Sequence, residues 1–220
     1  MKSNHKPQQI IVIIALIAFA MTACRNVDRV TPLTLSGQVS ELIDDSRFSP
    51  GGTLNGVLTS AIGGEGTVIN GQMNFTIGIP DPSLLQSVEE FFHVFFDPEG
   101  YNYTNVIFSV PEAKAAFFNE LNGQTENGEA FIIQRVGTNS DDGLLEAVSY
   151  IFVDRDITIT AEGRAGENGY ILVFDNIELQ FQRGWNVLFN KVDFFDFPFL
   201  VSLQVISRNG SPYDGLIWLR

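Results

Sequence analysis

Hydrophobic and polar residues alternate with a period of two along much of the chain after residue 32. The alternation is strictest in residues 33–39 (LTLSGQV) and 177–182 (IELQFQ). This period places successive side chains on opposite faces of a β-strand. The pattern therefore predicts half-buried strands in these two segments. Other segments that alternate or are rich in β-branched and aromatic residues are predicted strands too: 54–60, 73–79, 130–136, 145–153, 157–161, 170–174, 185–192, 200–206 and 216–219.

Glycine-rich and asparagine-rich segments separate the predicted strands. Asn70-Gly71 predicts a hairpin, because both residues tolerate a positive φ. Residues 63–66 (GGEG) predict a second turn. They lack the lysine and the following helix of a phosphate-binding loop.

One segment has a clear helical pattern. Asp81 and Pro82 have the residue types of an N-cap and a first helical position. From residue 84 to 96 the apolar residues gather on one side, as in a helix that packs against a sheet. These residues are Leu84, Leu85, Val88, Phe91, Phe92, Phe95 and Phe96. A shorter helix is predicted over 111–121, ending at Asn122-Gly123.

Many short strands, few helices and no repeat of 20–50 residues indicate a mainly β fold. We predict one antiparallel β-sandwich domain over residues 33–220, with a helical insertion at about 81–122. Two smaller sandwiches meeting at 125–128 (TENG) are the alternative.

The leader, residues 1–23, has a different pattern. Lys2 and Lys6 precede an apolar run over residues 10–21. As a helix this run would span about 18 Å, too short for a hydrocarbon core of about 30 Å. The leader therefore reads as a cleavable signal segment rather than a spanning helix.

Met21-Thr22-Ala23-Cys24 resembles the lipobox of bacterial lipoproteins, and Cys24 is the only cysteine. The resemblance implies cleavage before Cys24, acyl chains (palmitate among them) on that residue, and stable membrane anchoring. Residues 24–32 then form a tether. Arg25, in the place where inner-membrane lipoproteins typically carry aspartate, favours the outer membrane.

Removing residues 1–23 takes away Lys2 and Lys6 and shifts the net charge from −13 to −15. This negative net charge of the processed chain argues against nucleic acid as a partner and against a basic membrane-binding patch. Hydrophobic residues make up 45% of the chain and aromatic residues 12%. A core of this size needs neither disulfides nor a metal. No cofactor is expected.

Few residues suit catalysis or metal binding. His93, the only histidine after the leader, falls on the polar face of the predicted helix, and no G-x-S-x-G surrounds a serine. No zinc site is expected. Segments 97–102, 139–143 and 154–156 carry acidic residues that could bind calcium, but ordinary turns explain them better. Paired carboxylates of a glycosidase stay an open alternative.

The aromatic residues are the better lead to a binding site. Five tyrosine and tryptophan side chains each combine a flat apolar face with a polar group, and such side chains can stack on sugar rings or on a peptide. They are Tyr101, Tyr103, Trp185, Tyr213 and Trp218. The Phe pairs of the helix and the Phe-rich segment 194–199 could instead line a lipid pocket, although core packing explains the helix pairs better.

Four segments, LTLSGQV, NFTIGIP, DRDITITAEG and ELQFQRGWNVLFNKV, resemble parts of lipoproteins from host-associated bacteria such as spirochaetes and Bacteroidetes. The resemblance implies an immunoglobulin-like or transthyretin-like sandwich and transfers no catalytic residue. We expect a non-enzymatic, lipid-anchored envelope protein with a domain that binds a glycan or a protein. The alternatives are a glycan hydrolase and a lipid carrier.

Overall fold

A computed structural model describes residues 30–44, 47–50, 52–96, 104–137, 144–165, 172–193, 199–206 and 216–220. The leader, Cys24 and the tether up to residue 29 lie outside the described residues. Residues 31–220 form one compact unit. Segment 125–128 is the turn between two paired strands, so it does not separate two domains.

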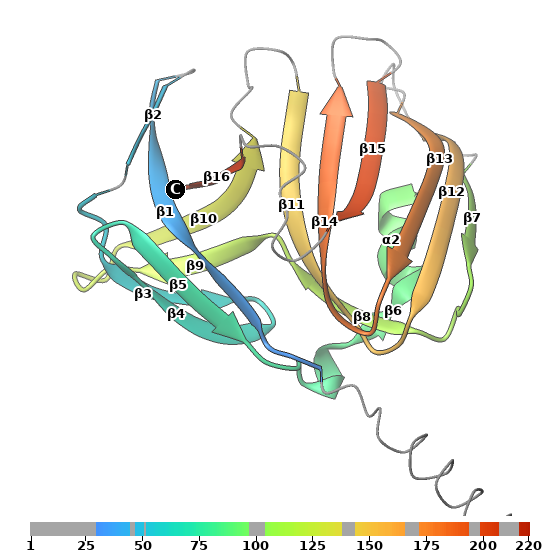
Figure 1. Ribbon diagram of the computed structural model, residues 1–220, viewed down its shortest axis with the longest axis horizontal. Helices are drawn as coiled ribbons and strands as arrows, with labels where there is room; N and C mark the ends of the chain where they lie inside the picture. Colours follow the sequence, from blue (N-terminus) through green and yellow to red (C-terminus); the bar gives the residue numbers. More distant parts are fainter. Residues whose placement is uncertain are drawn as a thin grey trace, which may run out of the picture. The chain divides into compact units, whose positions relative to one another are not determined.

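The fold is mainly β, as predicted, with sixteen strands and one short α-helix among the described residues (Figure 1). The strands are β1 (Leu33–Asp44), β2 (Arg47–Pro50), β3 (Gly56–Ser60), β4 (Gly63–Ile69), β5 (Gln72–Ile77), β6 (Gln86–Ser87), β7 (Thr104–Phe108), β8 (Lys114–Phe118), β9 (Glu120–Gln124), β10 (Ala130–Gly137), β11 (Leu144–Val153), β12 (Ile157–Ala165), β13 (Leu172–Phe181), β14 (Gly184–Asp193), β15 (Phe199–Ile206) and β16 (Leu216–Leu219).

Seven strands close into a barrel instead of forming one clear sandwich. In order around the barrel they are β1, β5, β4, β3, β9, β10 and β16, and β16 returns to pair with β1. The β1–β16 pairing is parallel, with Val39 opposite Trp218. The predicted sandwich is therefore wrong in this half. A period of two predicts strands but carries no information on whether a sheet closes.

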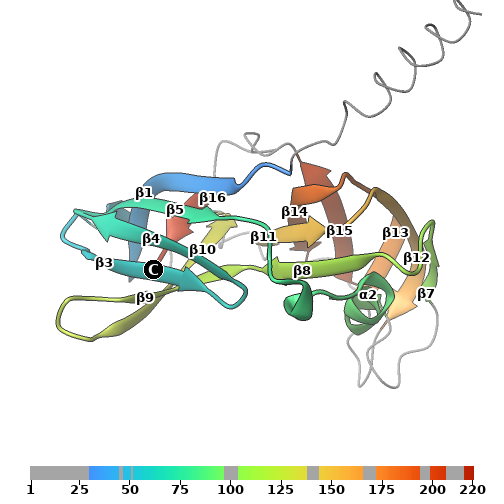
Figure 2. The ribbon, with the colours of Figure 1, turned by 90° about the horizontal axis from the view of Figure 1, so that it is seen from below.

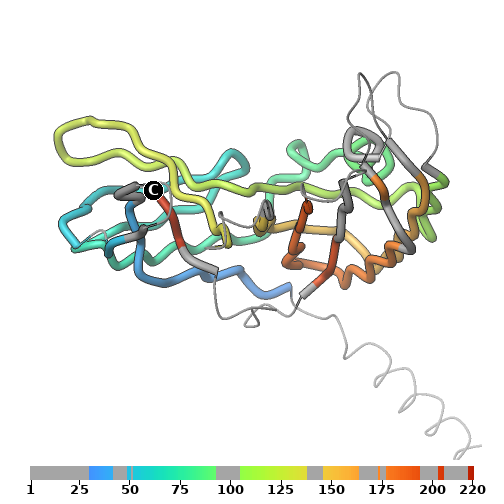
Figure 3. Tube along the Cα trace, turned by 90° about the horizontal axis from the view of Figure 1, so that it is seen from above, coloured from blue at the N-terminus to red at the C-terminus, as the bar shows by residue number. Residues whose placement is uncertain are grey.

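The sheet continues beyond the barrel, because β10 also pairs with β11, at Val136 and Ala147. This extension, called the second sheet below, has the order β6, β8, β11, β14, β15, β13, β12 and β7, while β2 pairs with β1 of the barrel. β8 pairs with β11 of this sheet, whereas β9 pairs with β3 and β10 of the barrel. Only Asn119 separates β8 from β9, so one stretch of chain runs from the second sheet into the barrel (Figure 3).

Helix α2 (Val88–Phe96) covers one face of the second sheet (Figure 2). Val88, Phe91 and Phe92 are buried in a core with side chains of β8 and β11–β15, which confirms these three residues of the predicted apolar stripe. The side chain of His93 lies outside the described residues, as do those of Phe95 and Phe96.

The helix begins later than the sequence predicts. Asp81 caps a short 3₁₀ turn over Pro82–Leu84 by accepting a hydrogen bond from the Ser83 amide. Residue 85 is then extended, and β6 pairs with β8 before α2 starts. Leu84 is consequently exposed instead of packed in the stripe.

The second predicted helix, over 111–121, is wrong. Residues 114–118 form β8, because Ala115–Phe118 pair with Tyr150–Val153 of β11. The turn predicted at segment 63–66 lies at residues 61–62 instead. The whole segment is the start of β4, where Gly64 and Gly66 lie against Phe75 of β5. The Asn70-Gly71 hairpin is confirmed, with φ values of 51° and 76°.

β11 and β14 are buried on both faces. Six consecutive residues of β14, from 184 to 189, are buried. On one face, Ile151 and Leu188 enter the core under α2. On the other, Tyr150 stacks on Phe118 of β8 and Trp218 of the barrel strand β16. β11 and β14 therefore separate the core under α2 from the side chains that pack against the barrel, and they contribute residues to both.

Candidate ligand-binding groove

A groove opens where two strands of the second sheet diverge. β13 and β15 pair over only three residue pairs, from Leu172–Phe199 to Phe174–Val201. β13 continues to Phe181 without β15 as a partner, while β15 stays paired with β14 down to Ile206 opposite Val187. β15 therefore acts as a wedge between β13 and β14, and the groove lies near its end.

The groove has a volume of about 780 Å³. This is within the range of about 300–1,000 Å³ that is usual for small-molecule sites. The half-buried Val205 gives it an apolar portion, beside the buried side chains of Ile157, Phe181 and Trp185. Polar side chains complete the lining: Ser109, Asp156, Thr158, Gln180, Gln182 and Asn186.

The connection between β13 and β14 is held rigidly by one buried side chain. The Asn186 amide donates to the carbonyls of Gln182 and Gly184, at 2.7 and 2.9 Å, and its oxygen accepts from the Gln182 backbone N–H at 3.0 Å. Gly184 has a φ of 101°, a conformation that suits glycine. The groove wall at this end is therefore preformed.

Two other lining residues are also held in place. The Asp156 carboxylate accepts the backbone N–H of Arg183 at 2.7 Å, and the Ser109 hydroxyl oxygen accepts the backbone N–H of Thr158 at 2.9 Å. By contrast, the side chains of Thr158 and Gln182 make no hydrogen bond within the described part of the chain. Their hydroxyl and amide groups, with the Ser109 O–H, are the ones available to a ligand.

Trp185 lies in the groove wall but offers no open ring face. Its side chain is buried, its indole N–H donates to the Gly78 carbonyl at 2.8 Å, and its ring packs edge-on against Phe118 and Phe152. The expectation that it stacks on a ligand is not met. It shapes the groove instead.

Trp218 lies elsewhere, inside the barrel. Its ring is buried beside Tyr150 and Gly37, with the Arg135 guanidinium 5.7 Å from the ring centroid. The two tryptophans therefore form no shared exposed patch. Tyr101, Tyr103 and Tyr213 lie outside the described residues.

The carboxylates of segment 154–156 are occupied by protein groups. Asp154 pairs with Arg155 and accepts the Lys114 backbone N–H at 2.9 Å. Among the described residues, no three His, Cys, Asp or Glu side chains are close enough to hold a metal ion. Segments 97–102 and 139–143 lie outside those residues.

Sequence reasoning missed most of the groove. Thr158 is half-buried on β12, and Gln180 and Gln182 are exposed at and just after the end of β13. In the sequence all three look like ordinary polar residues of alternating strands. They are brought together because β15 inserts between β13 and β14, which no local pattern indicates. The sequence singled out two lining residues, Trp185 as an aromatic residue for stacking and Asp156 as part of the acidic segment 154–156, and neither for this groove.

No helix in the described part of the chain combines the length and the apolar character needed to cross a membrane. The chain was compared with protein-family models, with curated proteins and with solved structures, and none of them matches it.

Proposed function

We propose that this chain is a lipid-anchored protein of the cell envelope, attached through Cys24, whose β-domain binds an uncharged glycan in the groove. The observation that carries the proposal is the lining of the groove: neutral hydroxyl and amide side chains beside an apolar portion. Sugar rings present hydroxyl groups at their edges and C–H groups on their faces. The polar side chains of the groove suit the hydroxyl groups, and its apolar portion suits the C–H faces.

The charge around the groove supports an uncharged ligand. Asp156 is the only charged side chain in its described lining, and its carboxylate already accepts a backbone N–H. No lysine or arginine side chain is available in that lining to pair with a phosphate, sulfate or carboxylate. An anionic ligand would meet a processed protein of net charge −15, and the groove lining has no cation to compensate it.

The proposed anchor rests on the leader. The order of basic residues, apolar run, small residues and Cys24 resembles a lipoprotein signal. Acyl chains on Cys24 would hold an acidic body that an anionic membrane surface repels. Arg25 favours the outer membrane.

The other two functions have less support. Glycoside hydrolysis ordinarily uses two carboxyl groups, whereas the described groove lining contains Asp156 alone. A lipid carrier needs a large apolar cavity under α2. The described residues there form a packed core, and the apolar cavity beside Phe91 and Phe117 measures only about 220 Å³.

Binding is tested on the full chain in detergent by isothermal titration calorimetry. The probes are cellobiose, maltose, laminaribiose and N,N′-diacetylchitobiose. Gln182→Ala combined with Thr158→Val removes the two unpartnered polar groups and should weaken binding at least tenfold. Thr67→Val, at an exposed position of the barrel strand β4, is the matched control and should bind like the unaltered protein.

Two results would overturn the proposal. One is that the unaltered protein binds none of the four disaccharides. The other is that the groove variant binds them as tightly as the Thr67→Val control. Thermal unfolding of each variant shows whether the fold is intact, so a loss of binding can be assigned to the groove.

A further inference from the structure

A second depression lies on the outer face of β7, β12 and β13, with a volume of about 320 Å³. Asn105 and Ile107 of β7 line it, with Thr160 and Glu162 of β12 and Glu178 of β13. The Ile107 side chain is 57% exposed. It gives this depression an apolar contact beside its polar groups.

The strand register places this depression next to the groove. Thr160 lies opposite Ile107 on one side and Glu178 on the other. Two residues along β12, Thr158 lies opposite Gln180 and bonds to Ser109, and these three residues line the groove. Side chains two apart on a strand point to the same face. The row Ile107–Thr160–Glu178 of the second depression and the row Ser109–Thr158–Gln180 of the groove are therefore neighbours on one surface.

One side-chain contact bridges the two rows. The Gln180 amide of the groove donates to the Glu178 carboxylate of the second depression, at 2.7 Å. No strand lies between the depressions, because both lie on the same strands β12 and β13. From Asp156, the residue before β12, to Glu162 the surface extends over six residue steps, roughly 20 Å at the usual rise of a strand.

Both depressions have the same charge character. Their described linings contain three carboxylates, Asp156, Glu162 and Glu178, and no lysine or arginine. Hydroxyl and amide groups supply the other polar contacts. A ligand that covers both depressions must therefore tolerate carboxylates along its length, which disfavours an anionic polymer.

We propose that the groove and the second depression form one track, which binds a linear, uncharged oligosaccharide lengthwise along β12. This inference rests on the proposed function and adds the form of the ligand. The chain must be long enough to reach from Gln182 to Glu162. Single sugars and disaccharides occupy the groove alone.

The test is a length series measured by calorimetry on the full chain in detergent. The probes are cello-oligosaccharides and N-acetylated chito-oligosaccharides of two to six units. The affinity for the series that binds should rise at least tenfold between the disaccharide and the pentasaccharide. Asn105→Ala combined with Thr160→Val should remove this rise and leave disaccharide binding unchanged.

The charge selection is tested with oligogalacturonides of the same lengths. They should bind at least tenfold more weakly than the neutral series. Glu162→Gln combined with Glu178→Gln should reduce that difference by at least threefold, because the two carboxylates that repel the acidic chain are gone. Retention of the full difference in this variant would overturn the charge selection.

The outcomes separate the two proposals. If disaccharides bind through Gln182 but longer chains gain nothing, the track is wrong and the glycan-binding groove stands. If the gain with length survives Asn105→Ala with Thr160→Val, the added units bind elsewhere and the track is again wrong. If no member of either neutral series binds, the proposed function fails, and the track with it.

Discussion

The rings of Tyr150 and Trp218 stack almost parallel, with their centroids 6.2 Å apart and 11° between their planes. Tyr150 belongs to β11 of the second sheet, and Trp218 belongs to β16, the strand that closes the barrel. The contact therefore joins the two halves of the fold. In the described structure no hydrogen-bond partner reaches the buried Tyr150 hydroxyl.

Tyr150→Phe should change how stability depends on alkaline pH. Burial raises the pKa of Tyr150 to about 12, and the positive charge of Arg135 acts in the opposite direction. The unfolded chain has a tyrosine pKa of about 10. The stability from keeping this phenol neutral is present below pH 10 and is lost as the pH rises to 12. Two pKa units correspond to about 2–3 kcal/mol.

Urea unfolding at pH 8 and at pH 11.5 measures this difference. At pH 8 the phenol is neutral in the folded and the unfolded chain. The two proteins should therefore differ only by what the hydroxyl contributes, about 1 kcal/mol including its interaction with Arg135. At pH 11.5 the variant should be the more stable of the two. If the free energy of unfolding falls equally in both proteins between pH 8 and pH 11.5, Tyr150 does not titrate in this way.

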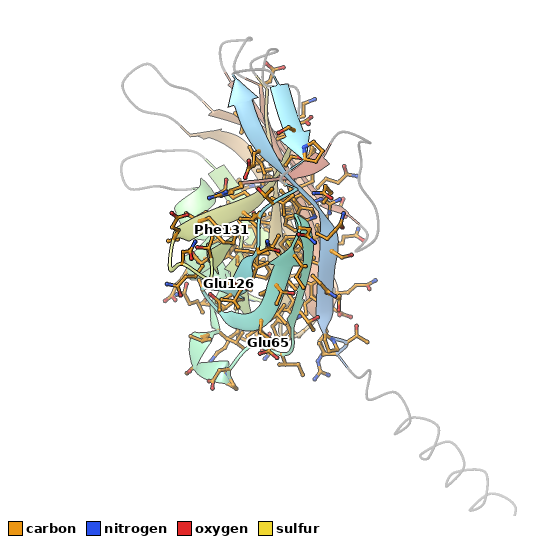
Figure 4. The ribbon with its side chains drawn as sticks, turned by 90° about the vertical axis from the view of Figure 1, so that its left-hand side faces the viewer. Glu65, Glu126 and Phe131 are labelled. Atoms are coloured by element: carbon orange, nitrogen blue, oxygen red, sulfur yellow. The ribbon has the colours of Figure 1, made fainter. Side chains whose placement is uncertain are left out.

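Gly123→Ala should destabilise the barrel. Gly123 of β9 lies opposite Phe131 of β10, whose side chain is labelled in Figure 4. A Cβ at position 123 would overlap the Phe131 ring, so the ring has to move. Overpacking of this kind costs about 1–3 kcal/mol.

Gly78→Ala is the matched control, because a Cβ there meets nothing within 4 Å. Its effect should stay within about 0.5 kcal/mol. Chemical denaturation of both variants gives the two free energies of unfolding. A Gly123→Ala variant as stable as Gly78→Ala would contradict the packing of Phe131 over β9.

The strands were the most predictable part of this fold. Alternation sufficed in β1 and β5, where buried and exposed residues face opposite sides of a sheet. Local patterns failed where distant pairing decides the conformation. Residues 114–118 (KAAFF) suit a helix but are held as a strand by β11, about 35 residues later in the chain.

The site was less predictable than the strands. The aromatic residues that suggested a surface for sugars include two buried tryptophans, because both indoles also suit a core. The groove depends on which strands are neighbours in the sheet. That order is a property of the whole fold, and Gln182 alone gives no sign of it.

Asp154→Asn should change stability in acid. Burial tends to raise the pKa of this carboxyl, but hydrogen bonds from Arg155 and the Lys114 N–H outweigh it and hold the pKa below its usual value. A lowered pKa stabilises the fold above the unfolded value of about 3.9. This contribution is lost as the pH falls further.

The side-chain amide of the Asp154→Asn variant keeps an acceptor for the Lys114 N–H, so this variant should lose less than about 1 kcal/mol at pH 7. Thermal unfolding at pH 3 and pH 7 should show a smaller acid-dependent fall in its midpoint than in the unaltered protein. Asp154→Ala removes the acceptor as well and should be the less stable variant at both pH values. An unchanged acid dependence in Asp154→Asn would contradict the role of this carboxylate.

Cys24→Ser should release the protein from membranes. The variant keeps the leader but lacks the sulfur that would carry the diacylglyceryl group. After cell fractionation it should appear in the soluble fraction or remain unprocessed, whereas an Arg25→Gln control should stay with the membranes. Metabolic labelling with palmitate should mark the control and leave Cys24→Ser unlabelled. A labelled Cys24→Ser variant would refute lipidation at this residue.

The barrel closes through residues that are very far apart in the sequence. Beside the β1–β16 pairing, Arg220 forms an ion pair with Glu41, 179 positions earlier. Contacts between residues this far apart slow folding, because the long loop between them must close, at a cost in entropy, before they form. Until β16 arrives, β1 and β10 each present an unpaired strand edge, and such edges pair readily with other chains. The state most exposed to aggregation is therefore a chain in which the four-residue strand β16 has not yet paired.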